Sequence, residues 1–312
     1  MNENKKCPIC DNFNSEFFVS TKVQMQNNDS VFSFHKCLNC DSIYLYDPPQ
    51  EEELVEFYGE NYLPYSSENI WGKYTFLVKK WQLMLDKRRA NFLINLNKKF
   101  NKETRILDFG CGHPSFLNEL EKKTGWKCFG FDFSNNGWIK NKNIFDNINL
   151  YSGDFNTIEF KTKFNLITMW HSLEHHFNPK QLLKKMHELS LEDSILIIEV
   201  PNFNSISRKI QKENWAGFHT PRHSVIYSAK SIELLLENSG WKVEKILKYG
   251  TLDAYIFWWL GEIEKKNISE NEIKSLEKYF SHFLLYKILY FPIFLFEKYF
   301  SFGLMTIICS KK

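Results

Sequence analysis

The sequence predicts an α/β protein built around a doubly wound, mostly parallel β-sheet, and three observations support this. An apolar segment, 105–109, runs directly into a glycine turn, 110–112, and glycine lets a backbone turn tightly and approach a ligand closely. A second apolar segment, 127–133, carries an acid, Asp132, near its end. A continuous apolar run, 195–198, suits a strand buried on both faces, as the strands of parallel sheets are.

Seven segments are expected to form the strands of this sheet. They are 105–109, 127–133, a segment ending near Tyr151, 165–170, 194–200, 241–247 and 304–309. Segments with helical spacing of apolar residues lie between them, such as the one that carries Phe116, Leu117 and Leu120. This alternation predicts helices on both faces of the sheet.

Composition and charge narrow the class of protein. A chain of 312 residues can hold one large domain and a small one, and 43% hydrophobic residues suffice for a substantial core. A net charge of +3 does not by itself indicate a nucleic-acid partner. The first six residues are polar and no apolar run follows, so we expect no signal peptide. These features, with the cysteine usage, predict a cytoplasmic protein.

Four of the seven cysteines form two Cys-x-x-Cys pairs, Cys7 with Cys10 and Cys37 with Cys40. Two such pairs can supply four thiolates to one tetrahedral Zn²⁺ ion, and because no coordination position then stays open, we expect a structural metal. Short apolar segments between the pairs are typical of strands, so residues 1–50 predict a zinc ribbon. The alternatives are four unrelated cytosolic cysteines or a redox pair, which is disfavoured because neither pair begins a helix after a strand.

Acidic residues fall near the ends of three successive predicted strands, where open α/β sheets bind their ligands. They are Asp108, Asp132 and Asp154. An acid at the end of the second strand can accept hydrogen bonds from both hydroxyls of a ribose, which predicts a site for an adenosine. A sheet of this kind that binds a different nucleotide is the alternative.

The order Asp108-x-Gly110-x-Gly112 resembles motif I of the class I S-adenosylmethionine (SAM)-dependent methyltransferases. The resemblance implies a Rossmann-like seven-stranded methyltransferase sheet whose last strand is antiparallel, with the glycine turn beside the methionine part of SAM. The resemblance extends over nearly the whole chain, with the methyltransferase domain at 101–312. One departure is His113-Pro114, which stands where the family has a further x-Gly pair, and the fixed φ of proline can reshape the turn.

The same resemblance assigns further cofactor contacts. Asp132 would bind the ribose, and Phe133 follows it directly. Asp154 resembles the acid of the family's adenine site, where the carboxylate accepts from the exocyclic amine. The neighbouring ring of Phe155 would stack on the base or flank it.

A cluster of titratable residues follows the fourth predicted strand. His171, Glu174 and His175 would lie beside the transferred methyl group. The segment resembles a branch of the family that includes ubiquinone-biosynthesis and small-RNA 3′-end methyltransferases, which use Glu-x-x-Glu-His to bind a divalent ion; His171 replaces the first Glu. Three readings stay open: a general base, a metal site, or polar residues that close the cofactor pocket.

A Trp-x-Gly-x-x-x-Pro-Arg-His loop follows the fifth predicted strand. It resembles a group of bacterial methyltransferases that have N-terminal zinc ribbons and are often encoded with surface-polysaccharide genes. Arg222 could hold a phosphate or carboxylate of the acceptor, with Trp215 and His219 beside it, and His219 or His223 could act as base. The alternative is that Arg222 and His223 pin the loop to the sheet.

Two helical regions flank the core. Residues 51–100 predict a helical cap, and residues 255–302 predict an aromatic-rich helical insert before the last strand. Lys287 and Pro292 interrupt the apolar run of the insert, so we expect no bilayer span. Covering the acceptor pocket, forming a homodimer face and lying on the inner face of a membrane are the three roles left open.

These features together predict SAM-dependent methylation, with O-methylation of a sugar, sugar nucleotide or lipid-linked glycan precursor as the leading hypothesis. The expected partners are SAM, a structural zinc ion and a small-molecule or glycan acceptor. RNA methylation is one alternative, disfavoured because the ribbon segment 11–33 carries little basic charge. A non-catalytic SAM-binding scaffold protein is the other.

Overall fold

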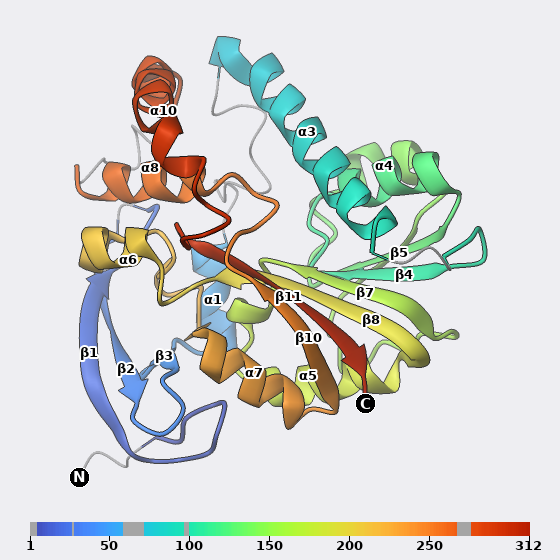
Figure 1. The fold of residues 1–312 in the computed structure, drawn as a ribbon, viewed down its shortest axis with the longest axis horizontal. Coiled ribbons are helices and arrows are strands. Elements are labelled where there is room, and N and C mark those ends of the chain that lie inside the picture. The colour runs from blue at the N-terminus through green and yellow to red at the C-terminus, as the bar shows by residue number, and fades with distance from the viewer. Residues whose placement is uncertain (1–4, 27, 59–71, 97–99, 267–275) are drawn as a thin grey trace.

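A seven-stranded sheet runs through the centre of the computed structural model (Figure 1), with the order β10-β11-β8-β7-β4-β5-β6. The structure describes residues 5–26, 28–58, 72–96, 100–266 and 276–312. The strands of the large sheet are β4 (Arg105–Phe109), β5 (Lys127–Asp132), β6 (Asn149–Ser152), β7 (Phe164–Trp170), β8 (Ser190–Pro201), β10 (Trp241–Leu247) and β11 (Leu304–Lys311).

The pairing of these strands confirms the expected fold class. Strands β4 to β8 pair in parallel, whereas β11 lies between β8 and β10 and pairs antiparallel with both. All seven predicted segments are strands, and the last one is antiparallel, as the resemblance implied. Since the carboxyl ends of the parallel strands meet at one edge, the loops after β4, β5, β6, β7 and β8 share that edge.

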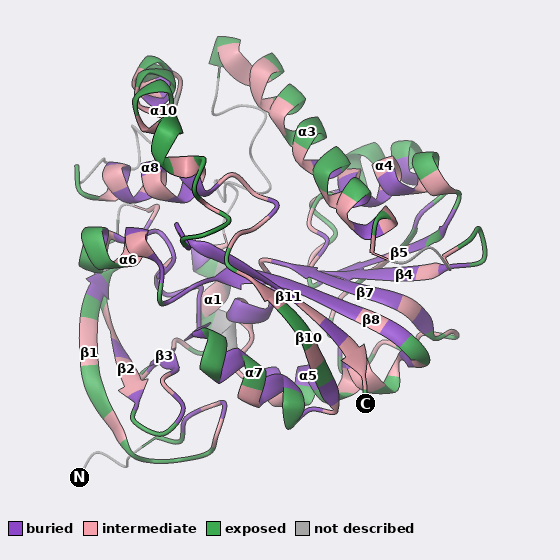
Figure 2. Ribbon diagram, in the orientation of Figure 1, coloured by how far each residue is buried: buried purple, intermediate pink, exposed green. Residues whose placement is uncertain are grey.

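Helices cover both faces of the large sheet (Figure 1). Helices α3 (Thr75–Ile94) and α4 (Ser115–Thr124) pack on one face, and α5 (Pro179–Glu188) and α7 (Ala229–Glu237) pack on the other. Successive side chains of a strand point to opposite faces. Ile106 therefore packs in the apolar core under α3 and α4, and Leu107 packs in the core under α5 and α7. The central strands are mostly buried, whereas the edge strands β10 and β6 are largely half-buried or exposed (Figure 2).

A smaller sheet holds the N-terminal segment. Its strands are β1 (Ser15–Lys22), β2 (Val31–Cys37), β3 (Ile43–Leu45) and β9 (Val225–Ile226), in that order. Strand β3 pairs antiparallel with β9, which comes from the loop after β8, through Ile43 with Ile226 and Tyr44 with Val225. The sheet therefore takes one edge strand from beyond the predicted 1–50 boundary. Residues 1–4 and 27 of that segment lie outside the described residues.

Short helices connect these layers. They are α1 (Glu51–Phe57), α6 (Ile206–Gln211), and the 3₁₀ helices η1 (Gly72–Tyr74), η2 (Ile139–Phe145), η3 (Leu173–His175), η4 (Lys212–Asn214) and η5 (Leu276–Tyr279). The predicted cap, 51–100, contributes α1, η1 and α3, and its parts at 59–71 and 97–99 lie outside the described residues.

The predicted insert, 255–302, contains α8 (Ala254–Glu264) and α10 (Phe280–Phe294), and 267–275 lie outside the described residues. The two helices pack together through an apolar cluster that contains Tyr255, Trp259 and Phe283. Among the described residues, we find no helix with the length and apolar character needed to cross a membrane.

Candidate active site

The glycine turn after β4 closes against the end of β5. Gly110 and Gly112 have φ values of 77° and 50°, in the left-handed region that favours glycine. The amide of Gly112 donates a hydrogen bond to Oδ2 of Asp132 over 2.9 Å. A Cβ at Gly110 would lie 2.5 Å from the side chain of Ser172, whereas a Cβ at Gly112 would meet nothing within 4 Å. The turn is thus packed on one side and open to a ligand on the other.

Asp108 is buried in β4, two residues before the first glycine of the turn. Its Oδ1 accepts a hydrogen bond from Oγ1 of Thr168 on β7 over 2.6 Å. Burial raises the pKa of Asp108 to about 7, against the hydrogen bond from Thr168, which favours the charged form. Asp108 therefore links β4 to β7, and a direct contact with SAM stays a prediction.

The end of β6 adjoins the end of β5. The amide of Gly153 donates to the carbonyl of Asp132 over 3.3 Å, and a Cβ at Gly153 would meet nothing within 4 Å. The exposed carboxylate of Asp154 accepts a hydrogen bond from the amide of Asn156 over 2.8 Å. Open space thus lies beside both Gly112 and Gly153, which fits a ligand that runs from the first strand end to the third.

Two phenylalanines predicted to bind the cofactor lie in different surroundings. The ring of Phe155 is 9% exposed and packs in the core, with its centroid 4.7 Å from that of Phe109 and 5.1 Å from that of Phe131. Phe133 is 56% exposed at the end of β5, and the ring of Tyr58 lies 5.4 Å from it. Phe133 is therefore the more accessible ring beside the expected adenosine site.

His171, at the end of β7, lies between two buried carboxylates. Its Nε2 is 3.0 Å from Oε1 of Glu199, and its Nδ1 is 3.7 Å from Oε1 of Glu174. Burial opposes protonation of His171, but the two carboxylates outweigh it and raise its pKa to about 9. Glu199 is equally buried, and His171 and the amide of Thr251 lower its pKa to about 2. His171 is therefore an imidazolium at neutral pH.

Three further histidines converge near His171 and Glu174. One ring nitrogen of each of His175, His219 and His223 lies within 4.8 Å of the others. Nδ1 of His223 is hydrogen-bonded to the carbonyl of Gly217 over 2.9 Å, and Nδ1 of His175 to the carbonyl of Arg222 over 3.0 Å. Burial lowers the pKa of His175 and of His223 to about 3, and that of His219 well below its usual value. All three are neutral imidazoles at physiological pH.

Two residues predicted to bind the acceptor are buried in the loop after α6. Nε1 of Trp215 donates to Oγ of Ser207 over 3.0 Å, and the indole is fully buried. Arg222 donates from Nε to the carbonyl of Phe57 over 2.6 Å and from Nη1 to that of Gln24 over 3.0 Å. These bonds tie the loop to the end of α1 and to the segment after β1. A contact of either residue with an acceptor stays a prediction.

The four cysteines of the paired motifs converge, as the spacing predicted. The Sγ atoms of Cys7, Cys10, Cys37 and Cys40 all lie within 4.8 Å of one another. The hydrogen bond with Cys40 lowers the pKa of Cys7 to about 5 against burial, and the thiolate is the form that binds metal. This N-terminal cluster fits a small zinc ribbon.

Two residues at the site were missed by the sequence reasoning. The hydroxyl of Tyr58 lies 2.9 Å from Nδ1 of His175, although no motif marks Tyr58. Glu199 could have been found, because it is the one charged residue within the apolar run 195–200 of β8.

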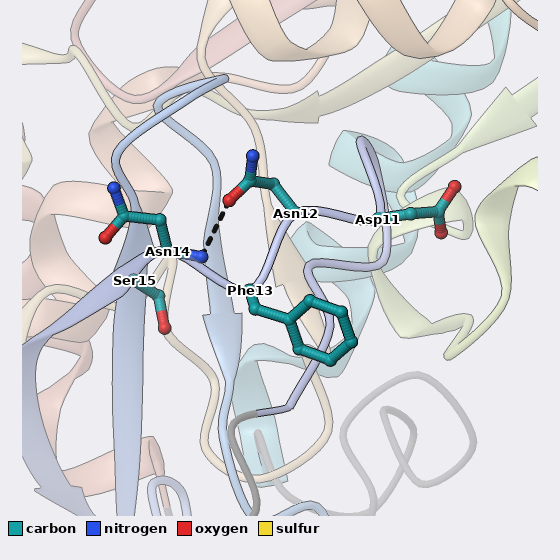
Figure 3. Close-up of a pocket in the computed structure, with 5 residues that line it drawn as sticks. All are labelled: Asp11, Asn12, Phe13, Asn14 and Ser15. Atoms are coloured by element: carbon teal, nitrogen blue, oxygen red, sulfur yellow. Dashed lines mark hydrogen bonds between the residues drawn. The ribbon is translucent and has the colours of Figure 1, made fainter.

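A surface pocket elsewhere on the small sheet is lined by residues 11–15 (Figure 3). Figure 3 shows the side chains of Asp11, Phe13 and Asn14 pointing in different directions, with a 2.7 Å hydrogen bond from the amide of Asn14 to Asn12. Because Asp11 is its one titratable side chain, this pocket does not offer the converging acids and bases of a catalytic site.

The fold and the site at the strand ends together define a methyltransferase core. Residues 82–246 match a family model described as "Methyltransferase domain", a span of more than half of the chain. The chain therefore belongs to this family and is a SAM-dependent methyltransferase. Among curated proteins, none matches the sequence.

Solved structures share the fold at low sequence identity. In a complex between the Haloferax volcanii Trm112 methyltransferase activator and a putative methyltransferase, the matching chain is 13% identical, with a TM-score of 0.51 over 80% of this chain and 96% of that one. Mycolic acid cyclopropane synthase CmaA1, complexed with SAH and CTAB, is 13% identical, and the Mycobacterium tuberculosis cyclopropane synthase MmaA2 is 12% identical. Both have a TM-score of 0.50 over 72% of this chain and 83% of theirs. These similarities support the fold alone.

Proposed function

We propose that the chain transfers the methyl group of SAM to a hydroxyl oxygen of a sugar, a sugar nucleotide or a lipid-linked glycan precursor. The observation that carries this proposal is the group of His175, His219 and His223 beside Glu174. Glu174 and His175 follow β7 shortly after Ser172, which packs on Gly110. A hydroxyl must lose its proton as the bond from oxygen to methyl forms, and neutral imidazoles can accept it. An acceptor that needs no deprotonation would not require such a group.

The cofactor contacts follow from the strand ends. When bound, SAM supplies an electrophilic methyl on its sulfonium and leaves as S-adenosylhomocysteine (SAH). The open side of Gly112 would take the methionine part of SAM. The carboxylate of Asp132 would accept hydrogen bonds from the ribose hydroxyls and would then share its hydrogen bond from the amide of Gly112. Asp154 would accept from the adenine amine, with Phe133 against the base and Phe155 supporting it from the core.

The surroundings of each histidine suggest its role in proton transfer. His171 is already protonated, so we assign it to holding Glu174 and Glu199 in position rather than to accepting a proton. His175 and His223 are neutral, and a neutral imidazole can take the proton of the acceptor hydroxyl. The carboxylate of Glu174, 3.9 Å from Nε2 of His223, would stabilise the imidazolium that forms.

The acceptor would enter beside the loop that carries His219. His219 is half-buried, whereas Trp215 and Arg222 are buried beneath it, so His219 is the loop residue most able to touch an acceptor. We assign Trp215 and Arg222 to shaping this loop, and a structural Zn²⁺ on the four cysteines to holding the small sheet against it.

A lipid-linked acceptor would suit the surface of the insert. Ten apolar side chains between 284 and 300 are 37–72% exposed, which is unusual for a protein that stays monomeric in water. Lys278 and Lys298 are exposed near the two ends of this apolar segment. We propose that it lies on an anionic lipid surface, with the lysines toward the headgroups, on the inner face of the membrane.

The test is methyl transfer from radiolabelled SAM. Sugar nucleotides and undecaprenyl-linked sugars are offered as acceptors, with RNA as the comparison, and the position of the label is read by mass spectrometry. Label on a hydroxyl oxygen of a sugar supports the proposal, whereas label on RNA or on nitrogen overturns it. His175→Ala and His223→Ala test the bases, since neither is the base if both variants keep full turnover.

A further inference from the structure

We propose that His175, His219 and His223 form a binding site for a divalent transition-metal ion, distinct from the four-cysteine cluster. One ring nitrogen of each lies within 4.8 Å of the others. Their rings are nearly perpendicular to one another, at 80–86°, with centroids 4.6–6.2 Å apart. Rings in this arrangement do not stack; they can direct nitrogens toward one point, and imidazole nitrogen is a preferred ligand of Zn²⁺, Co²⁺, Ni²⁺ and Fe²⁺.

Backbone carbonyls orient two of these rings for metal binding. A carbonyl only accepts hydrogen bonds, so Nδ1 of His223 carries the proton that it donates to Gly217. Nδ1 of His175 lies 3.0 Å from the carbonyl of Arg222 and 2.9 Å from the hydroxyl of Tyr58, and because a hydroxyl can also accept, one proton on Nδ1 serves both partners. Each Nε2 then keeps its lone pair. A metal-binding histidine usually makes this second bond to a carbonyl or carboxylate, which fixes its tautomer and its orientation.

A buried carboxylate beside the histidines supplies negative charge. The side chain of Glu174 is fully buried, and neither of its oxygens makes a hydrogen bond to any described residue. Its Oε1 lies 3.9 Å from Nε2 of His223 and 3.7 Å from Nδ1 of His171. Because the unprotonated Nε2 cannot donate to the carboxylate, two acceptors face each other in a buried place, which is unfavourable. A cation between them would satisfy both.

Such an ion would narrow the choice of acceptor, and this step rests on the proposed O-methyl transfer. Three imidazoles leave at least one coordination position open, and in catalytic sites that position takes an oxygen of water or substrate. An acceptor hydroxyl bound there would lose its proton more readily, because the cation stabilises the alkoxide. With the ion bound, the lone pairs of His175 and His223 are held by the metal, so the proton would pass to the carboxylate of Glu174 in place of a histidine. The site thus fits an acceptor that offers an oxygen ligand.

The test counts metal ions on the full-length protein. Protein purified with zinc is first analysed for its metal content and then titrated with Co²⁺, followed by calorimetry and visible absorption. We expect one equivalent of zinc on the cysteines and one further equivalent of Co²⁺ without sulfur-to-metal charge transfer. His219→Ala and His223→Gln should weaken the second equivalent on the order of 10- to 100-fold or more. His282→Ala, on α10, is the matched control and should leave it unchanged.

The outcomes separate this site from the proposed function. A single metal equivalent in wild-type protein, or Co²⁺ binding unaffected by both histidine variants, overturns the metal site. SAH calorimetry on each variant checks that the fold is intact, and His219→Gln, at the half-buried position, replaces any variant that does not fold. Wild-type protein that binds the second ion but no SAH would instead overturn the proposed methyl transfer and leave the metal site standing.

Discussion

The imidazole of His171 bridges two strands of the sheet to the insert through Glu199. Nε2 of His171 lies 3.0 Å from Oε1 of Glu199 on β8, and Glu199 also accepts hydrogen bonds from the amides of Thr251 and Leu252, which precede α8. The ring of Phe257 on α8 stacks on the imidazole with centroids 5.8 Å apart. The insert is therefore fastened to the sheet directly beside His171.

Replacing Glu199 should destabilise the protein because the buried partners of the carboxylate would be left without an acceptor. For Glu199→Ala we expect a loss of about 3–5 kcal/mol in the free energy of unfolding, measured by chemical denaturation. Glu199→Gln, which keeps the shape and one acceptor, should lose less. Glu244→Ala, at an exposed position on β10, is the control and should change little.

The contribution of His171 and Glu199 to the free energy of unfolding should depend on pH. The folded pKa of His171 is about 9, above its ordinary value, so the stability it contributes is complete below about pH 6.5 and is lost as the pH rises through 9. The difference in unfolding free energy between wild type and Glu199→Gln should therefore shrink between pH 7 and 9.5. A difference that stays constant over this range would contradict the protonated state of His171.

Asp132 should control cofactor affinity. In Asp132→Ala we expect SAH binding to weaken by about 1–3 kcal/mol, because a charged hydrogen-bond acceptor for the ribose is lost, along with the acceptor of the Gly112 amide. Calorimetry with SAH measures this. Asp193→Ala, on an exposed part of β8, should bind like wild type. An unchanged affinity in Asp132→Ala would show that the ribose site lies elsewhere.

Asp108→Asn should stabilise the protein in alkaline but not in acidic solution. The folded pKa of Asp108 is about 7, above its ordinary value, so the stability linked to its proton is present below about pH 4 and is lost as the pH rises through 7. Asparagine carries no charge and can still accept from Thr168. The melting temperature of the variant should exceed that of wild type at pH 8.5 by several degrees, and the gain should disappear near pH 4. An equal shift at both values would contradict the raised pKa.

The elements of the fold were predictable because each depends on a local pattern. Apolar runs located the strands around Asp108 and Asp132, and the paired spacing of cysteines such as Cys7 and Cys10 located the four-cysteine cluster. The edge strand Val225–Ile226 of the small sheet was not predictable. It has two residues, and its pairing with β3 depends on how the loop after β8 folds back on the ribbon.

The site was predicted in its residue types but not in its contacts. His171, His175 and His223 do gather, because the loops after β7 and β8 emerge at the same edge of the sheet. Their surroundings give them different protonation states. Two carboxylates keep His171 protonated, whereas burial keeps His175 neutral. Tyr58 reaches the site only through the position of α1, which no sequence pattern near Tyr58 encodes.

Removing the metal from the four cysteines should unfold the small sheet. Metal binding contributes folding energy in small zinc domains, and this sheet shares its core with Trp215 and Phe218 of the loop that carries His219. We expect Cys40→Ser to lose one equivalent of zinc and to expose Trp215, seen as a shift of tryptophan fluorescence to longer wavelength. Cys309→Ala, in β11, should keep its zinc. A Cys40→Ser protein with full zinc content would overturn the assignment.

The exposed apolar face of α10 should bind lipid. Ile288 and Leu289 are 72% and 62% exposed, while Phe283 on the same helix packs against α8, so replacing the first two leaves the packed face unchanged. Burying an aliphatic side chain contributes about 1.5–3 kcal/mol, and losing two should reduce binding to phosphatidylglycerol vesicles by more than tenfold. Vesicle co-sedimentation measures this for Ile288→Asp/Leu289→Asp, with Val31→Asp, at an exposed position of β2, as the control. If wild-type protein does not bind the vesicles and sediments as a dimer that the double substitution dissociates, then this face is a contact between two copies of the chain.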